Sequence, residues 1–168
     1  MKKLLLFCLF NLLTFSASYA QELPEVNKIK LNKASQYKDA EALVLKTTQY
    51  LLTQDLELKK VDRRKAGQFL IKWMNGTPHH TFYLEKQDIR YFENNTDYIL
   101  SFMAALTQYS LAHPDLPRQS KFIGALELVL PYLQKFTTPK DRSRELEELM
   151  YQFDNNQLAD YIAKNYID

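Results

Sequence analysis

Cysteine and glycine are both scarce in this chain of 168 residues. The only cysteine is Cys8, and it lies in an N-terminal apolar stretch whose cleavage would remove it. The remaining chain could then form no disulfide and could offer no thiolate as a nucleophile or metal ligand. Three glycines are too few to build a phosphate-binding loop or a dinucleotide-binding fingerprint. These absences exclude several common classes of enzyme.

An excess of charge is also lacking. Lysine and arginine total 22 against 20 aspartate and glutamate residues, and Lys2 and Lys3 lie in the same N-terminal stretch. Without those two lysines the positive total is 20 and the net charge is zero. The sequence therefore predicts no general affinity for nucleic acid or anionic lipid. It also contains neither a G-x-S-x-G nor an H-E-x-x-H motif, which argues against common hydrolases.

The first twenty residues have the pattern of a cleavable signal peptide. Lys2 and Lys3 precede an apolar run over residues 4–15, and the small residues Ser18 and Ala20 stand where a signal peptidase cuts. That run is shorter than the roughly 20 residues that a helix needs to cross a bilayer. We therefore expect export to the periplasm or the medium, with no transmembrane segment left after cleavage of residues 1–20.

Beyond the leader, the apolar residues recur at helical spacing almost throughout. Residues 21–34 are polar and predict a flexible N-terminal arm, and residues 35–168 predict one α-helical domain. The expected fold is all-α, with about six helices paired as antiparallel hairpins, either in a bundle or in a short solenoid-like stack. The expected helices are 35–53, 62–76, 97–113, 117–136 and two shorter ones after residues 139 and 156.

Capping residues set the predicted helix ends. Ser35, Asp62 and either Thr96 or Asp97 are side chains that commonly accept the first free N–H groups of a helix. Gly76 stands where a helix often ends in a left-handed residue.

The stretch Trp73–Phe82 (WMNGTPHHTF) contains the only tryptophan and two of the three histidines. Trp73 falls on an apolar stripe, Gly76 is the expected cap and Pro78 turns the chain, so we interpret the stretch as a structural joint. His79 and His80 are weak candidate metal ligands, because neighbouring residues diverge and seldom bind one ion together. No cofactor is predicted.

The segment from Phe82 to Phe92 has no clear period and could hold a short strand or a helical turn, although an irregular connector is favoured. Connectors usually lie at the surface, and aromatic and arginine side chains are common at binding hot spots. We therefore predict that Tyr83, Arg90 and Tyr91 contribute to a partner-binding surface. The alternative is that the connector folds back and buries its rings near Trp73.

The pattern W-M-x-G-T-P-x-x-T-F also resembles a group of short exported bacterial proteins of unknown function. The resemblance is firmest over these ten residues. It implies bacterial export and an all-helical domain, and it implies no activity.

The sequence thus favours an exported, non-enzymatic helical module that binds a protein or other component of the bacterial cell envelope. The alternative is a small periplasmic hydrolase or metal-dependent enzyme that uses His79 or His80 with nearby carboxylates. An enzyme requires a concave pocket where polar groups converge, whereas a binding module requires only a groove or an aromatic patch.

Overall fold

The computed structural model describes residues 22–165, so the predicted signal peptide lies outside the described residues. This part of the chain folds into eight α-helices and three short 3-10 helices, without a strand, and the prediction of an all-α fold is confirmed. The α-helices are α1 (Ala34–Asp39), α2 (Glu41–Thr53), α3 (Lys60–Gly76), α4 (Lys86–Ile89), α5 (Thr96–Ala112), α6 (Arg118–Phe136), α7 (Arg144–Asp154) and α8 (Leu158–Asn165). The 3-10 helices are η1 (Val26–Lys28), η2 (Arg90–Phe92) and η3 (Pro139–Asp141).

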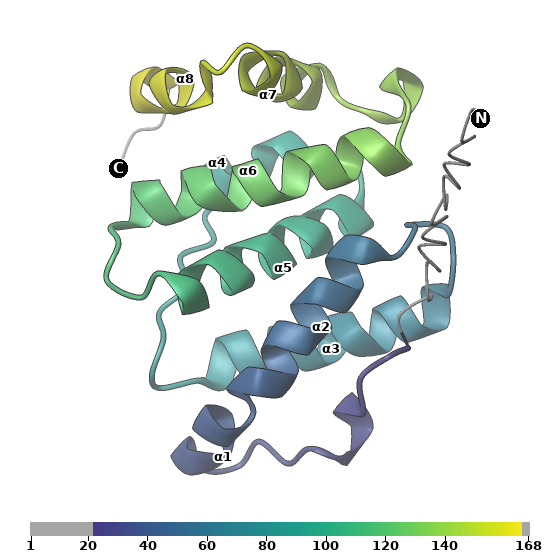
Figure 1. Ribbon diagram of the computed structural model, residues 1–168, viewed down its shortest axis with the longest axis vertical. Coiled ribbons are helices and arrows are strands. Elements are labelled where there is room, and N and C mark those ends of the chain that lie inside the picture. The colour runs from purple at the N-terminus through teal and green to yellow at the C-terminus, as the bar shows by residue number, and fades with distance from the viewer. Residues whose placement is uncertain (1–21, 166–168) are drawn as a thin grey trace, which may run out of the picture.

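The helices pack in successive layers, in which α2 rather than α3 makes the larger contact with α5 (Figure 1). α1, α2 and α3 occupy one end, α5 and α6 lie side by side in the middle, and α7 and α8 cover α6 at the other end. The count exceeds six because residues 35–53 form two helices, α1 and α2, which meet at Ala40, and because α4 arises within the predicted connector. None of the helices between residues 22 and 165 is both long and apolar enough to cross a membrane.

The segment predicted as a flexible arm carries part of the core. Val26 in η1 and Leu31 are 5% and 4% exposed, and they belong to the hydrophobic cluster formed mainly by α2 and α3. A second cluster lies among α5, α6, α7 and α8. Phe82 and Leu84 pack against both clusters, so the connector after α3 joins the two halves of the core.

A buried arginine ties four helices together at the centre of the molecule. Arg63 on α3 is 1% exposed. Its Nη1 donates to the carbonyl of Leu51 on α2 at 2.9 Å and to the hydroxyl of Tyr132 on α6 at 3.1 Å. Its Nη2 donates to Ser101 on α5 at 3.4 Å. Asp97 supplies the counter-charge, with Oδ1 3.6 Å from Nε. Neutral oxygens therefore receive most of the donors of this guanidinium.

Three of the predicted N-caps are displaced by one or a few residues. Ser35 lies inside α1, which begins at Ala34. Asp62 lies in the first turn of α3 rather than before it. The cap of α5 is Asn95, whose side chain accepts from the backbone N–H of Asp97 at 2.8 Å. Any of several neighbouring polar side chains can accept from a free N–H, so the residue types alone do not fix the position of a cap.

The prediction that Gly76 is left-handed is wrong. No glycine has a positive φ in the described part of the chain, and Gly76 is the last residue of α3. The helix ends because Thr77 precedes Pro78, which disfavours helical geometry, and Thr77 has an extended ψ of 126°. Glycine leaves space at position 76 instead, because a Cβ there would overlap the hydroxyl of Tyr37 unless that ring moved.

The other two glycines also make room for a side chain of a neighbouring helix. A Cβ at Gly124 on α6 would overlap the ring of Tyr109 on α5. A Cβ at Gly67 on α3 would lie 2.8 Å from Cδ2 of Leu100 on α5. Both glycines therefore mark places where helices pack closely.

Candidate binding cleft

Trp73 holds the chain that follows α3 against the protein. Its side chain is fully buried, its ring centre lies 5.7 Å from that of His80, and the ring of Phe82 is 5.9 Å away. The Nε1 of Trp73 donates to the carbonyl of Tyr37 at 2.8 Å. His80 is further held by Glu41 on α2, with 2.8 Å between Nε2 and Oε1. These contacts bring Trp73, His80 and Phe82 together, and the interpretation of Trp73, Gly76 and Pro78 as a structural joint stays a prediction.

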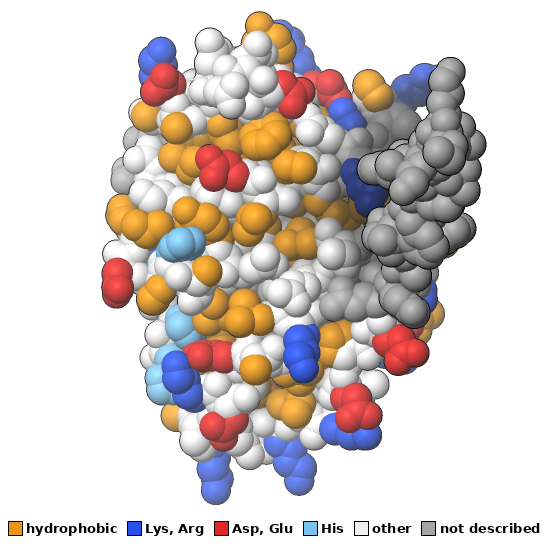
Figure 2. All heavy atoms as spheres, in the orientation of Figure 1, with side chains coloured by type: hydrophobic (Ala, Val, Ile, Leu, Met, Phe, Trp, Pro, Cys, Tyr) orange, Lys and Arg blue, Asp and Glu red, His pale blue; other side chains and the backbone are white. Residues whose placement is uncertain are grey.

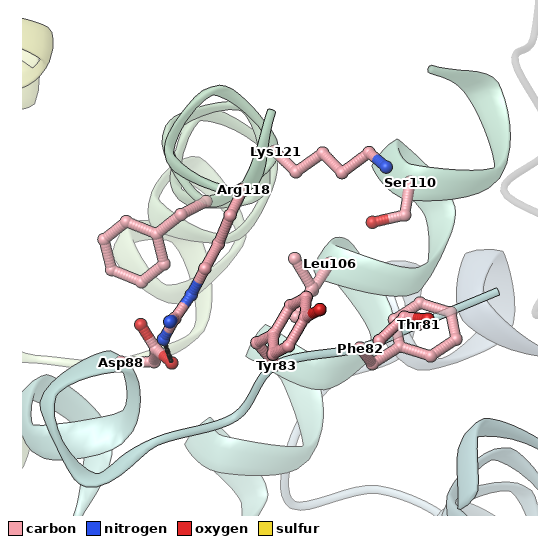
Figure 3. Close-up of a pocket in the computed structure, with 9 residues that line it drawn as sticks. Thr81, Phe82, Tyr83, Asp88, Leu106, Ser110, Arg118 and Lys121 are labelled. Atoms are coloured by element: carbon pink, nitrogen blue, oxygen red, sulfur yellow. Dashed lines mark hydrogen bonds and ion pairs between the residues drawn. The ribbon is translucent and has the colours of Figure 1, made fainter. Parts of the chain in front are cut away.

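A cleft opens between this segment and the α5–α6 turn. Its narrow inner hollow has a volume of about 30 Å³ and an apolar floor of Phe82, Leu106 and Phe122. Its outer hollow has a volume of about 300 Å³. The two hollows share five lining residues, so we treat them as one site and call it the side cleft. The shared residues are Thr81, Tyr83, Ser110, Arg118 and Lys121 (Figure 3).

Arg118, in the first turn of α6, fixes the position of one cleft wall. Its Nη1 donates to Glu85 and its Nη2 donates to Asp88, each at 2.9 Å. Asp88 is buried, and its Oδ2 also accepts from the backbone N–H of Glu85 at 2.7 Å, which completes a capping box at the start of α4. The guanidinium lies 5.3 Å from the ring centre of Tyr83. The capping box thus orients Asp88, and the guanidinium of Arg118 lies against both Asp88 and the ring of Tyr83 (Figure 3).

Lys121 and His79 bring basic groups to the outer hollow. The Nζ of Lys121 donates to the carbonyl of Pro114 at 2.6 Å, which leaves its charge without a carboxylate partner in the described part of the chain. The lining of the outer hollow contains no aspartate or glutamate. Asp88 lines only the inner hollow, where it pairs with Arg118, and Glu85 pairs with the same guanidinium. An anionic group is therefore best placed near Lys121.

The two histidines that were candidate metal ligands have different surroundings. His79 is exposed, and its backbone N–H contacts Thr77 Oγ1 at 3.4 Å. His80 is half-buried and bonded to Glu41. Burial alone would raise the pKa of Glu41, but hydrogen bonds from His80 and Lys38 outweigh it and hold that pKa below its ordinary value. Within residues 22–165, no three histidine, cysteine, aspartate or glutamate side chains are grouped closely enough to hold a metal ion.

Histidine side chains gather along one edge of the face drawn in Figure 2. The same edge holds the segment after α3 and the turn between α5 and α6 in Figure 1. Hydrophobic side chains also reach the surface there.

The three residues predicted to bind a partner do not form one surface. Tyr83 is 56% exposed and lines the side cleft. Arg90 is exposed but does not line that cleft. Tyr91 is 2% exposed, which corrects the expectation that its ring is available at the surface. The reason is that α7 packs over η2, where Ser143 donates to the carbonyl of Tyr91 at 3.3 Å. Arg90 donates to the Tyr91 hydroxyl at 2.6 Å.

The sequence reasoning missed the residues of the opposite wall. Ser110, Arg118 and Lys121 lie in or beside helices that were predicted correctly, but nothing local indicates which segment faces them. The one available signal was the spacing of Arg118 and Lys121, because residues three apart in a first turn lie on the same face of a helix.

The chain matches no known family model, and neither the curated proteins nor the solved structures compared with it give a match. The interpretation of the side cleft consequently depends on its own geometry.

Proposed function

We propose that the protein is an exported binding module of the bacterial cell envelope, and that it binds an acidic segment of a partner protein in the side cleft. It carries out no reaction of its own. The leader over residues 1–20 and the resemblance of the W-M-x-G-T-P-x-x-T-F stretch support export from a bacterial cell.

The observation that carries the proposal is the mixed lining of the cleft. An apolar floor of Leu106 and Phe122 lies beside the exposed ring of Tyr83, and Lys121 stands in an outer hollow without a carboxylate. Apolar pockets with a few polar groups that fix orientation are typical of binding sites. An apolar side chain next to a carboxylate matches both parts of this lining.

The proposal is tested with a defined peptide. The probe is an acetylated and amidated heptapeptide in which valine and glutamate alternate, and its matched control replaces every glutamate by glutamine. Calorimetric titration of the protein should give tighter binding of the glutamate peptide. Lys121→Glu should weaken that binding by about tenfold, because it places a like charge beside the ligand carboxylate.

Lys164→Glu provides the matched control variant, since Lys164 is an exposed lysine of α8 that does not line the cleft. It changes the net charge equally and should leave the affinity unchanged. Equal affinities for the glutamate and glutamine peptides, or equal losses in Lys121→Glu and Lys164→Glu, would contradict the proposal.

A further inference from the structure

We propose that residues 80–84 form a single, preformed strand that pairs through its main chain with an extended segment of the partner. This inference rests on the proposed function, since it names how the occupant of the side cleft is held. It adds that recognition is by strand addition, with hydrogen bonds between backbones and not between side chains alone.

The first observation is a period of two in the exposure of the side chains. Thr81 and Tyr83 are exposed and line both hollows of the cleft. His80, Phe82 and Leu84 are half-buried. Alternation of this kind is the mark of an extended chain, in which successive side chains point to opposite sides. A helix would instead give a period of about 3.6 residues.

The second observation concerns the backbone itself. Within residues 22–165, the N–H and C=O groups of residues 80–84 make no hydrogen bond with the protein. Backbone groups are strong donors and acceptors that are nearly always paired in folded proteins. A row of unpaired groups along an extended chain is a template for another strand.

The third observation is that both ends of the segment are fixed. At one end, α3 stops before Pro78 and His80 is bonded to Glu41. At the other end, Glu85 begins α4 through its capping box with Asp88. Phe82 anchors the middle against Trp73. A segment that is already held in place loses little conformational freedom on binding, which favours association.

The occupant is identified by the charges around the segment. A partner strand would lie about 4.8 Å from residues 80–84. Its side chains would alternate between the face of Thr81 and Tyr83 and the face of His80, Phe82 and Leu84. Those on the first face would turn toward the outer hollow and meet Lys121 and His79, where no carboxylate lines the wall. An extended segment with acidic residues at every second position therefore fits. A second copy of this chain offers His80–Leu84 instead, which contains no acidic residue.

Amide hydrogen exchange of the protein, followed residue by residue by nuclear magnetic resonance, tests the inference. In the free protein the amides of residues 80–84 should exchange rapidly, because they lack partners. With the saturating valine–glutamate peptide, amides of one parity, either 81 and 83 or 80, 82 and 84, should exchange at least about tenfold more slowly. The other parity should change little, since adjacent N–H groups of a strand point to opposite edges.

The same peptide with single N-methyl groups gives an independent measurement. N-methylation removes one backbone donor and leaves every side chain in place. Methylation at alternate positions should weaken binding by about tenfold or more, and methylation at the positions between them should not. This period of two in the affinity would not arise from recognition of side chains.

The outcomes separate the two proposals. Binding that depends on glutamate and Lys121, without slower amide exchange and with the same effect of every N-methyl group, overturns strand addition and leaves the proposed function intact. No binding of the glutamate peptide at millimolar concentration overturns both. Protection of the amides that grows with protein concentration in the absence of peptide would show pairing between two copies, which also overturns the inference.

Discussion

Two arginines hold different regions of this molecule together, and their surroundings are opposite. Arg63 is fully buried at the junction of α2, α3, α5 and α6, where a carbonyl and two hydroxyls receive its Nη donors. Arg118 is 25% exposed at the side cleft and is paired with the carboxylates of Glu85 and Asp88.

The difference indicates what each region is built for. Neutral oxygens on three other helices receive the Nη donors of Arg63 while the rest of the chain excludes water, so its hydrogen bonds join these helices in the core. Two carboxylates at a partly open site neutralise Arg118 and hold the cleft wall in place, whereas Lys121 has no carboxylate partner in the described part of the chain. One region therefore stabilises the fold, and the other orients a surface.

The largest expected effect comes from removal of the buried guanidinium. Arg63→Ala should lower the free energy of unfolding by about 3 kcal/mol, because it opens a cavity and leaves buried acceptors unpaired. Arg118→Ala should cost less, about 2 kcal/mol, because its guanidinium is 25% exposed, although the buried carboxylate of Asp88 loses its counter-charge and still accepts from the N–H of Glu85. Urea denaturation of both variants, monitored by far-ultraviolet circular dichroism, measures the difference. Equal losses would remove the distinction between the two regions.

A smaller effect is expected at the joint between the regions. Gly76→Ala should lower the free energy of unfolding by about 1 kcal/mol, because the added methyl group meets the hydroxyl of Tyr37. In a Tyr37→Ala background the same change should be neutral or stabilising, since alanine favours a helix more than glycine does. Thermal unfolding of the four proteins in this double-mutant cycle checks the assignment. Loss of stability in both backgrounds would indicate backbone strain instead of crowding.

The smallest effect concerns the hydrogen bond between His80 and Glu41, which holds the segment after α3 against α2. The pKa of Glu41 lies below its ordinary value of 4.5, so its stabilising contribution is present above about pH 4.5 and is lost as the pH falls through the lowered pKa. Glu41→Gln should therefore be less stable than the wild type by less than about 1 kcal/mol at neutral pH. The gap should shrink in acid. Denaturation series between pH 3 and pH 7 measure it, and a gap that widens toward low pH would contradict the assigned sign.

Helices in this chain are predictable because their apolar residues recur at helical spacing, which places them on one buried face. Residues 117–136 were expected as one helix on this basis, and α6 spans Arg118–Phe136. Helix ends were less predictable, because Ser35 and Asp62 have capping side chains that the fold does not use as caps.

The side cleft was not predictable, since its walls are about thirty residues apart in sequence. Tyr83 and Tyr91 lie in one segment without a clear helical or strand period, and on this basis both rings are predicted to be exposed. Tyr83 is exposed, whereas α7 buries Tyr91. Local sequence does not record which of two similar rings a distant helix will cover. Lys121 became part of the site only when α6 was placed opposite the segment after α3.

The three glycines carry a consequence for how this protein can change in evolution. Each glycine faces a large side chain of another helix, namely Leu100, Tyr37 and Tyr109 for Gly67, Gly76 and Gly124. None is needed for its backbone conformation, because none has a positive φ among the described residues. A related protein can therefore replace glycine at position 124 once position 109 has become small. The two positions of each pair should covary among homologues, with the sum of their side-chain volumes nearly constant.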